Sequence, residues 1–101
     1  MKSYYVYILK CSDNSYYTGI TNNLERREAE HNEGVSGISY TFSRRPVKLM
    51  WWTEFTSPDL AIDLEKQIKG WSRRKKEALI NNEWDRLKRL SKNYNDYGKL
   101  P

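Results

Sequence analysis

The sequence predicts an α+β domain in which a small three-stranded antiparallel sheet is flanked by helices. Two runs rich in aromatic and β-branched residues, at residues 4–8 and 16–20, lie on either side of a polar break at residues 12–14, which is typical of a β-hairpin. A third strand-like run covers residues 47–54. Segments with helical start signals follow the second and third strands, and this order favours an antiparallel sheet with helices around it.

The length of the hairpin loop decides whether its tyrosines share a face. A three-residue loop at 12–14, with Asn14 in the left-handed conformation, pairs Tyr7 with Gly19 and sets it diagonal to Tyr17. Opposed residues of an antiparallel pair lie on the same face of the sheet. We therefore expect two phenols to stand together beside a glycine that leaves room for a ligand.

A helix is expected from Leu24 to about residue 33, begun by a capping box of Asn22 and Glu25. Arg27 and His31 lie one turn apart on one face of this helix. Because the helix has few apolar residues, it gains little from packing. Two interpretations stay open here: a polar face that belongs to a site, and an ordinary solvated surface helix.

Residues 32–46 are rich in glycine and serine and are predicted to form a loop. Within it, aromatic and basic side chains interleave at Tyr40, Phe42, Arg44 and Arg45. That composition suits contacts with a nucleic-acid backbone together with base stacking. The alternative is that the two aromatic rings pack at the edge of the core while the arginines are solvated.

In the third strand, we expect Val47, Leu49 and Trp51 to lie on one face. A helix begins after Ser57, which precedes a proline in the first turn, and it is followed by helices at about 73–80 and 83–90. Glu65 lies at the border of the apolar stripe of the first of these helices. It can face a cleft, or it can simply pair with Lys69 one turn on.

The composition sets the remaining limits. The chain has 101 residues, enough for one domain, predicted at residues 1–90, with a polar and frayed tail at 91–101. Neither a membrane-spanning apolar run nor the layout of a signal peptide is present, so no membrane association is expected. The single cysteine, Cys11, excludes an internal disulfide and fits a reducing cytoplasm. One cysteine and one histidine also exclude zinc fingers and Cys-His nucleophiles.

The charge points to a polyanionic partner. Eighteen Lys and Arg against thirteen Asp and Glu give a net charge of +5, and residues 66–76 hold basic side chains and no acid. A nucleic-acid surface is the favoured interpretation, with a merely solubilising basic face as the alternative. Its expected contacts are Arg44, Arg45, Lys69, Arg73 and Arg74.

Several elements then fall in a familiar order. The tripeptides at 5–7 (YVY) and 17–19 (YTG) are followed by Arg27, His31 and a helix that carries Glu65. This order resembles the signature of the GIY-YIG nuclease domain, with both tripeptides in altered form. The resemblance covers about residues 3–80 and is closest to small, stand-alone bacterial members.

The resemblance implies the chemistry of a divalent-metal-dependent endonuclease. Glu65 would hold one Mg²⁺ or Mn²⁺ ion, Arg27 would grip the phosphate, and His31 could relay a proton. Tyr7 corresponds to the proposed general base and Tyr17 to the residue that positions water or phosphate, with Gly19 beside them as a structural residue of the site. A phenol is a poor base at neutral pH, so Tyr7 would need help from a neighbour. The family also has a late asparagine, which Asn81 or Asn82 could match.

DNA is the expected substrate, with DNA repair or processing as the setting, and RNA stays open. The alternative of another class is a nucleic-acid-binding module with weak or no activity on the same scaffold. A third is a small RNA-binding α/β protein outside this family. The sequence does not decide the oligomeric state, and a monomer is the working expectation.

Overall fold

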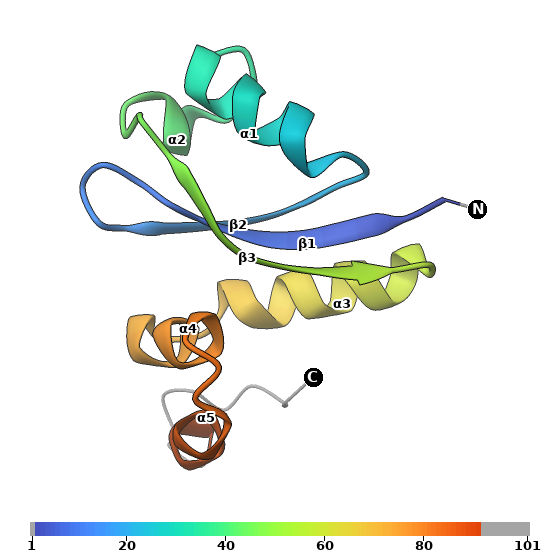
Figure 1. Cartoon of the computed structure of the whole chain (residues 1–101), viewed down its shortest axis with the longest axis vertical. Coiled ribbons are helices and arrows are strands. Elements are labelled where there is room, and N and C mark those ends of the chain that lie inside the picture. Colours follow the sequence, from blue (N-terminus) through green and yellow to red (C-terminus); the bar gives the residue numbers. More distant parts are fainter. Residues whose placement is uncertain (1, 92–101) are drawn as a thin grey trace.

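The computed structural model describes residues 2–91, and in it the sheet lies between two groups of helices (Figure 1). Strands β1 (Tyr4–Lys10), β2 (Tyr16–Thr21) and β3 (Lys48–Phe55) are antiparallel and lie in the order β2-β1-β3. Helices α1 (Leu24–Glu33) and α2 (Ser39–Phe42) lie on one side of the sheet. Helices α3 (Pro58–Lys69), α4 (Arg73–Ile80) and α5 (Trp84–Ser91) lie on the other. The predicted α+β class is confirmed.

The alternation of side chains along β1 gives the domain two hydrophobic clusters. Val6 and Ile8 face α3, α4 and α5 and pack in the larger cluster with Ala61, Leu64, Ile68, Trp71, Ala78, Leu79 and Leu87. The next residues, Tyr7 and Leu9, face α1 in the smaller cluster with Cys11 and Val47. Residues one apart in a strand point to opposite faces, so β1 is buried from both sides.

The hairpin has the predicted register. Tyr7 is paired with Gly19, and Leu9 is paired with Tyr17. Asn14 adopts a positive φ of 68°, and the Cys11 amide donates to the Ser15 carbonyl at 2.8 Å to close the turn. Tyr7 and Tyr17 therefore lie on the same face of the sheet, the face that α1 covers.

The alternation expected for β3 is wrong beyond Leu49. The pairing shifts between Ile8, which pairs with Trp51, and Leu9, which pairs with Leu49. This bulge inserts Met50 as an extra residue, and an extra residue reverses the faces of all that follow. Trp51 accordingly packs in the cluster on the α3 side, whereas Leu49 packs on the α1 side.

Two predictions around α1 need correction. Asn23, and not Asn22, caps the helix, because its side chain accepts a hydrogen bond from the Arg26 amide at 3.0 Å. The segment 32–46 is not a continuous loop, since residues 39–42 form α2. Gly34 ends α1 in the left-handed conformation, with a φ of 76°.

The structure places the predicted helices near their expected bounds. The predicted tail at 91–101 falls, apart from Ser91 at the end of α5, outside the described residues. Within residues 2–91, no helix is both long and apolar enough to span a membrane.

Candidate active site

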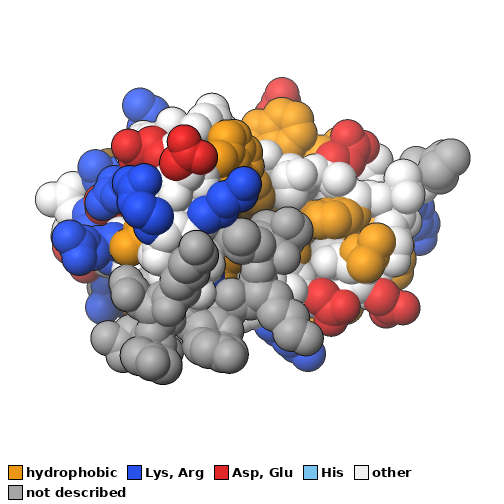
Figure 2. All heavy atoms as spheres, turned by 90° about the horizontal axis from the view of Figure 1, so that it is seen from below, with side chains coloured by type: hydrophobic (Ala, Val, Ile, Leu, Met, Phe, Trp, Pro, Cys, Tyr) orange, Lys and Arg blue, Asp and Glu red, His pale blue; other side chains and the backbone are white. Residues whose placement is uncertain are grey.

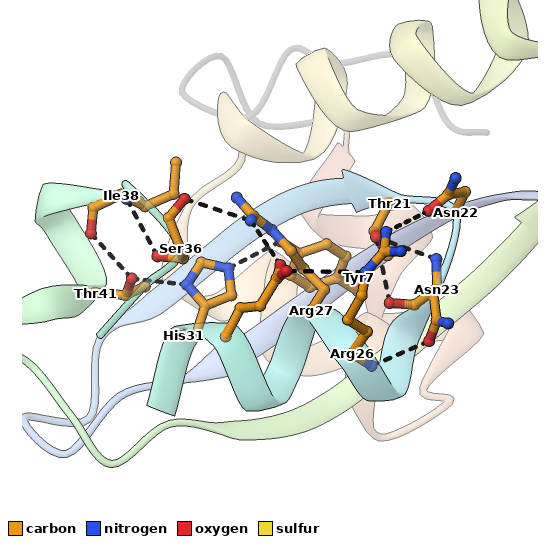
Figure 3. Close-up of polar contacts among 11 residues, drawn as sticks. Tyr7, Thr21, Asn22, Asn23, Arg26, Arg27, His31, Ser36, Ile38 and Thr41 are labelled. Carbon is orange, nitrogen blue, oxygen red and sulfur yellow. Dashed lines mark hydrogen bonds and ion pairs between the residues drawn. The ribbon is translucent and has the colours of Figure 1, made fainter. Parts of the chain in front are cut away.

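The site is built around a contact between β1 and α1. The hydroxyl of Tyr7 lies 3.1 Å from Nε2 of His31 (Figure 3). Both side chains are almost removed from solvent, with 2% of Tyr7 and none of His31 exposed. A histidine at this depth needs partners for both ring nitrogens, because buried polar groups without hydrogen bonds are costly.

Thr41 supplies the second partner, and its own hydrogen bond favours a proton on Nδ1 of His31. Nδ1 of His31 lies 2.7 Å from the Thr41 hydroxyl, and that hydroxyl donates to the carbonyl of Ile38 at 3.2 Å. Since the hydroxyl has only one hydrogen to donate, it accepts from Nδ1–H. Nε2 is then the unprotonated nitrogen, and the hydroxyl of Tyr7 donates to it.

Burial keeps both Tyr7 and His31 neutral at pH 7. Desolvation raises the pKa of Tyr7 to about 12, although a hydrogen bond with Arg27 opposes this rise. Burial and then the positive charge of Arg27 lower the pKa of His31 below its ordinary value. The result is a phenol hydrogen-bonded to an imidazole that is free to accept its proton.

Arg27 borders this pair from the first half of α1. Its guanidinium donates to Glu30 at 3.1 Å and to the Ser36 carbonyl at 3.4 Å (Figure 3). Burial acts against the charge of Arg27, but the hydrogen bonds with Tyr7 and Glu30 keep its pKa above the ordinary value. Since 23% of the side chain is exposed, a permanent cation lies beside Tyr7 within reach of an anion. The neighbouring Arg26 instead bonds Asn22, at 2.8 Å.

Tyr17 and Gly19 complete the side of the site that β2 forms. The ring centre of Tyr17 lies 6.3 Å from that of Tyr7 and 5.3 Å from that of His31. A Cβ atom on Gly19 would lie only 2.5 Å from the hydroxyl oxygen of Tyr7. The room at Gly19 is therefore filled by Tyr7 and not by a ligand, which corrects the expectation from the sequence.

Glu65 approaches from the opposite side of the sheet. It belongs to α3, and its carboxylate forms an ion pair with Lys69 at 2.8 Å. Its negative charge also contributes to the raised pKa of Tyr7. The ion pair with Lys69 is thus present, and the charge of Glu65 also acts on Tyr7. That Glu65 faces a cleft stays a prediction.

A divalent metal fits this donor set only together with a substrate. No group of three or more His, Cys, Asp or Glu side chains within residues 2–91 is arranged to hold an ion. Mg²⁺ is commonly bound by one or two carboxylates, with substrate phosphates and water completing its ligands. Glu65, with 14% of its side chain exposed, offers one such carboxylate.

Some of the residues predicted to contact nucleic acid already form contacts within the protein. The guanidinium of Arg44 lies 4.0 Å from the centre of the Tyr40 ring, and that of Arg45 lies 4.4 Å from the centre of Phe42. Arg44 also bonds Asp13, at 3.0 Å. The rings are exposed and the arginines lie on them, so the alternative in which the rings pack at the edge of the core is wrong. Contact of these side chains with nucleic acid stays a prediction.

The basic residues of α3 and α4 form the other part of the predicted surface. Arg73 lies 4.7 Å from the centre of the Tyr16 ring and pairs with Glu77 at 3.3 Å. From below, Lys and Arg side chains gather toward the end of the molecule where α4 lies in Figure 1 (Figure 2). Arg74 belongs to α4, and Lys69 is the last residue of α3.

Two further placements differ from what the sequence suggests. Thr41 is a site residue that the sequence does not indicate, since its only sequence signal is a hydroxyl ten residues after His31. Asn81 and Asn82 form the turn between α4 and α5, on the side of the sheet away from α1 (Figure 1). The structure thus brings Tyr7, Tyr17, Arg27 and His31 together, and it brings neither asparagine to them.

Comparison with known proteins identifies a family model and several relatives that match this chain. The model of the GIY-YIG catalytic domain matches residues 3–78. A UPF0213 protein of Natronomonas pharaonis is 48% identical over 80 residues, which cover 79% of this chain and 93% of that protein. A UPF0213 protein of Syntrophus aciditrophicus is 47% identical over 87 residues, which cover 86% of this chain and 100% of the other.

Solved structures agree with the fold. The solution NMR structure of a UPF0213 protein from Bacillus halodurans matches with a TM-score of 0.53 at 38% identity, over 90% of this chain and 99% of that one. The solution NMR structure of a protein from E. faecalis matches with a TM-score of 0.57 at 35% identity, over 83% and 88%.

Proposed function

The chain belongs to the GIY-YIG catalytic domain family, and from this membership and the site geometry we propose that it is a divalent-metal-dependent endonuclease acting on DNA. The observation that carries the proposal is the buried hydrogen-bond chain from Tyr7 through His31 to Thr41. A module that only binds nucleic acid does not need an oriented, neutral imidazole behind a phenol. A hydrolase needs such an arrangement to move a proton.

The proton steps follow from the tautomer of His31. Water attacks phosphorus and gives a proton to the oxygen of Tyr7, while Tyr7 passes its own proton to Nε2 of His31. The bond from phosphorus to the leaving oxygen breaks, and that oxygen takes a proton from solvent. Because Tyr7 never has to exist as a free phenolate, its raised pKa is compatible with this role.

The remaining side chains bind and orient the substrate. Arg27 is placed to grip the phosphate with its planar guanidinium and to stabilise the charge that develops on it. Tyr17 positions water or phosphate beside Tyr7. A Mg²⁺ or Mn²⁺ ion held by Glu65 would neutralise phosphate charge and assist the leaving oxygen.

The setting of the activity is inferred from charge and composition. A net charge of +5, with basic residues concentrated at 66–76, supports a nucleic acid as the substrate. DNA repair or processing in the cytoplasm is the proposed role. The buried thiol of Cys11 suits such a reducing compartment.

One observation favours a second candidate function. Nζ of Lys69 lies 2.8 Å from Oε2 of Glu65, which is the only carboxylate proposed to hold the metal ion. If that ion pair persists when nucleic acid binds, the protein is a nucleic-acid-binding module that uses the same basic surface and does not cut.

The test is a panel of single-stranded, paired, flapped and gapped DNA and matching RNA, each with Mg²⁺, Mn²⁺ or EDTA. We expect metal-dependent cleavage of at least one DNA substrate, which the matched variant Tyr7→Phe does not perform. Salt-dependent binding without cleavage of any substrate would select the binding module. Cleavage that persists in EDTA would overturn the metal dependence.

A further inference from the structure

A cavity of about 310 Å³ lies along the outer edge of β2. Three tyrosines, a threonine and two lysines line it: Tyr16, Tyr17, Thr18, Tyr40, Lys69 and Lys76. The strand order β2-β1-β3 makes β2 an edge strand, so within the described sheet no strand covers this side. The volume is at the low end of the range for small-ligand sites, which suits one flat ring system and not a base pair.

The walls of the cavity are held in place before any ligand arrives. The ring centres of Tyr17 and Tyr40 are 6.1 Å apart, with their planes inclined by 31°. The guanidinium of Arg44 supports the Tyr40 ring from 4.0 Å, and it is fixed by hydrogen bonds to Asp13 and to the Tyr40 carbonyl. Even so, 37% of Tyr40 remains exposed. Packing alone therefore does not account for this ring.

The Thr18 hydroxyl adds an independent observation. Thr18 is only 3% exposed, and its hydroxyl oxygen has no hydrogen-bond partner within residues 2–91. A buried hydroxyl without a partner is costly, so a partner is expected from outside the protein. The oxygen itself is enclosed, but Thr18 is one of the residues that line the cavity, so a change of its side-chain rotamer would turn the hydroxyl toward a ligand seated there.

Tyr17 connects this cavity to the proposed catalytic pair. Its ring lines the cavity and also lies 5.3 Å, between ring centres, from His31. A nucleotide with its base in the cavity would therefore have its own phosphate, or the next one, near Tyr7. The lysines at the cavity add the positive charge that a phosphate backbone requires.

We infer that this cavity receives a single unstacked base beside the phosphate to be cut, so that the substrate is a strand that is unpaired at that position. The inference rests on the proposed nuclease function and specifies its substrate. Aromatic side chains bind bases through their flat faces, and those faces are hidden in a stacked duplex. A paired base could reach the cavity only after it is unpaired and extruded from the duplex.

The test measures binding in EDTA, so that it does not depend on cleavage. The probe is a short DNA strand carrying 2-aminopurine, used alone and paired with its complement. We expect tighter binding of the single strand, with a change in 2-aminopurine fluorescence when the base stacks on a tyrosine. The paired probe should bind more weakly and show no such change.

Substitutions of Tyr40 test whether the preference for the single strand arises in the cavity. Tyr40→Ala should weaken binding of the single strand by roughly 5- to 150-fold, the range for loss of one base–aromatic stack, while Tyr40→Phe should keep most of the affinity. The control is Trp84→Ala, which removes an aromatic side chain that is 54% exposed on α5. It should leave binding unchanged. Thermal unfolding of each variant establishes that it folds.

The outcomes separate this inference from the proposed function. Equal binding of both probes, or a folded Tyr40→Ala variant with full affinity, overturns the inference that the cavity receives a base, even if the protein cleaves paired DNA. Conversely, a preference for the single strand that depends on Tyr40 supports base binding in the cavity even if no substrate is cut. In that case only the nuclease proposal fails.

Discussion

The hydroxyl of Tyr7 lies 3.1 Å from Nε2 of His31, and with Nδ1–H donating to Thr41 it is the donor of this hydrogen bond. A phenol whose pKa is raised to about 12 is a weak base by itself. With a neutral imidazole behind it, Tyr7 can take one proton while it releases another. The proposed chemistry depends on this relationship.

Removal of the Tyr7 hydroxyl should abolish the relay and leave the fold intact. Tyr7→Phe keeps the ring that packs with Leu9 and Val47 but cannot pass a proton. Since general acid–base groups contribute about 10²- to 10⁴-fold, we expect a loss of that order in single-turnover cleavage. DNA affinity in EDTA should stay within about twofold, because the phosphate grip of Arg27 is retained. A variant that still cuts at the parent rate would exclude Tyr7 as the proton acceptor.

Thr41 should control the tautomer of His31. Thr41→Val removes the acceptor for Nδ1–H, whereas the matched variant Thr41→Ser keeps a hydroxyl at the same place. We expect Thr41→Val to lower the free energy of unfolding by about 1–3 kcal/mol, since it leaves a buried N–H without a partner. Cleavage should also fall, by about tenfold or more. Nitrogen-15 NMR of the imidazole should report Nδ1–H in the parent and in Thr41→Ser, and a parent spectrum with Nε2–H would contradict the assignment.

The buried His31 should make folding stability depend on pH. Burial lowers the pKa of His31 in the folded protein, whereas in the unfolded chain it titrates at about 6.5. Below about pH 6.5 the unfolded state therefore binds more protons, and the free energy of unfolding falls as the pH is lowered through the folded pKa. The full contribution is present above about pH 6.5. Urea unfolding at a series of pH values should show this decline in the free energy of unfolding. At pH values above those where carboxylates titrate, the decline should be smaller in His31→Gln.

Much of this molecule could be predicted from its sequence because the signals are local. The three-residue loop fixed the register of Tyr7 against Gly19, and residues 57–58 marked the start of α3. The family resemblance, which rests on spacing along the chain, is confirmed by the match over residues 3–78.

The remaining features depend on contacts between segments that are distant in the chain. The bulge at Met50 arises from pairing with β1, and no propensity of the residue itself indicates it. Thr41 became a site residue because a single turn of helix carries its hydroxyl to His31. Likewise, nothing in the sequence indicates that the guanidinium groups of Arg44 and Arg45 lie on the rings of Tyr40 and Phe42.

Substitution of Glu65 best distinguishes the enzyme from the binding module. Glu65→Gln keeps the size of the side chain and removes the charge that would hold a cation, and Arg27→Ala removes the phosphate grip. Both variants should lose cleavage, but their effects on metal-free DNA affinity should be opposite. Affinity should stay level or rise in Glu65→Gln, because a negative charge near phosphate is gone, and it should fall in Arg27→Ala.

The most direct measurement is therefore the single-turnover cleavage rate of Glu65→Gln in Mg²⁺, beside its DNA affinity in EDTA. A metal-dependent nuclease predicts that the rate drops by about a hundredfold or more, as expected when one electrostatic stabiliser of the transition state is lost, while affinity is retained. Undiminished cleavage by Glu65→Gln would contradict the account, because Glu65 would then be only the ion-pair partner of Lys69.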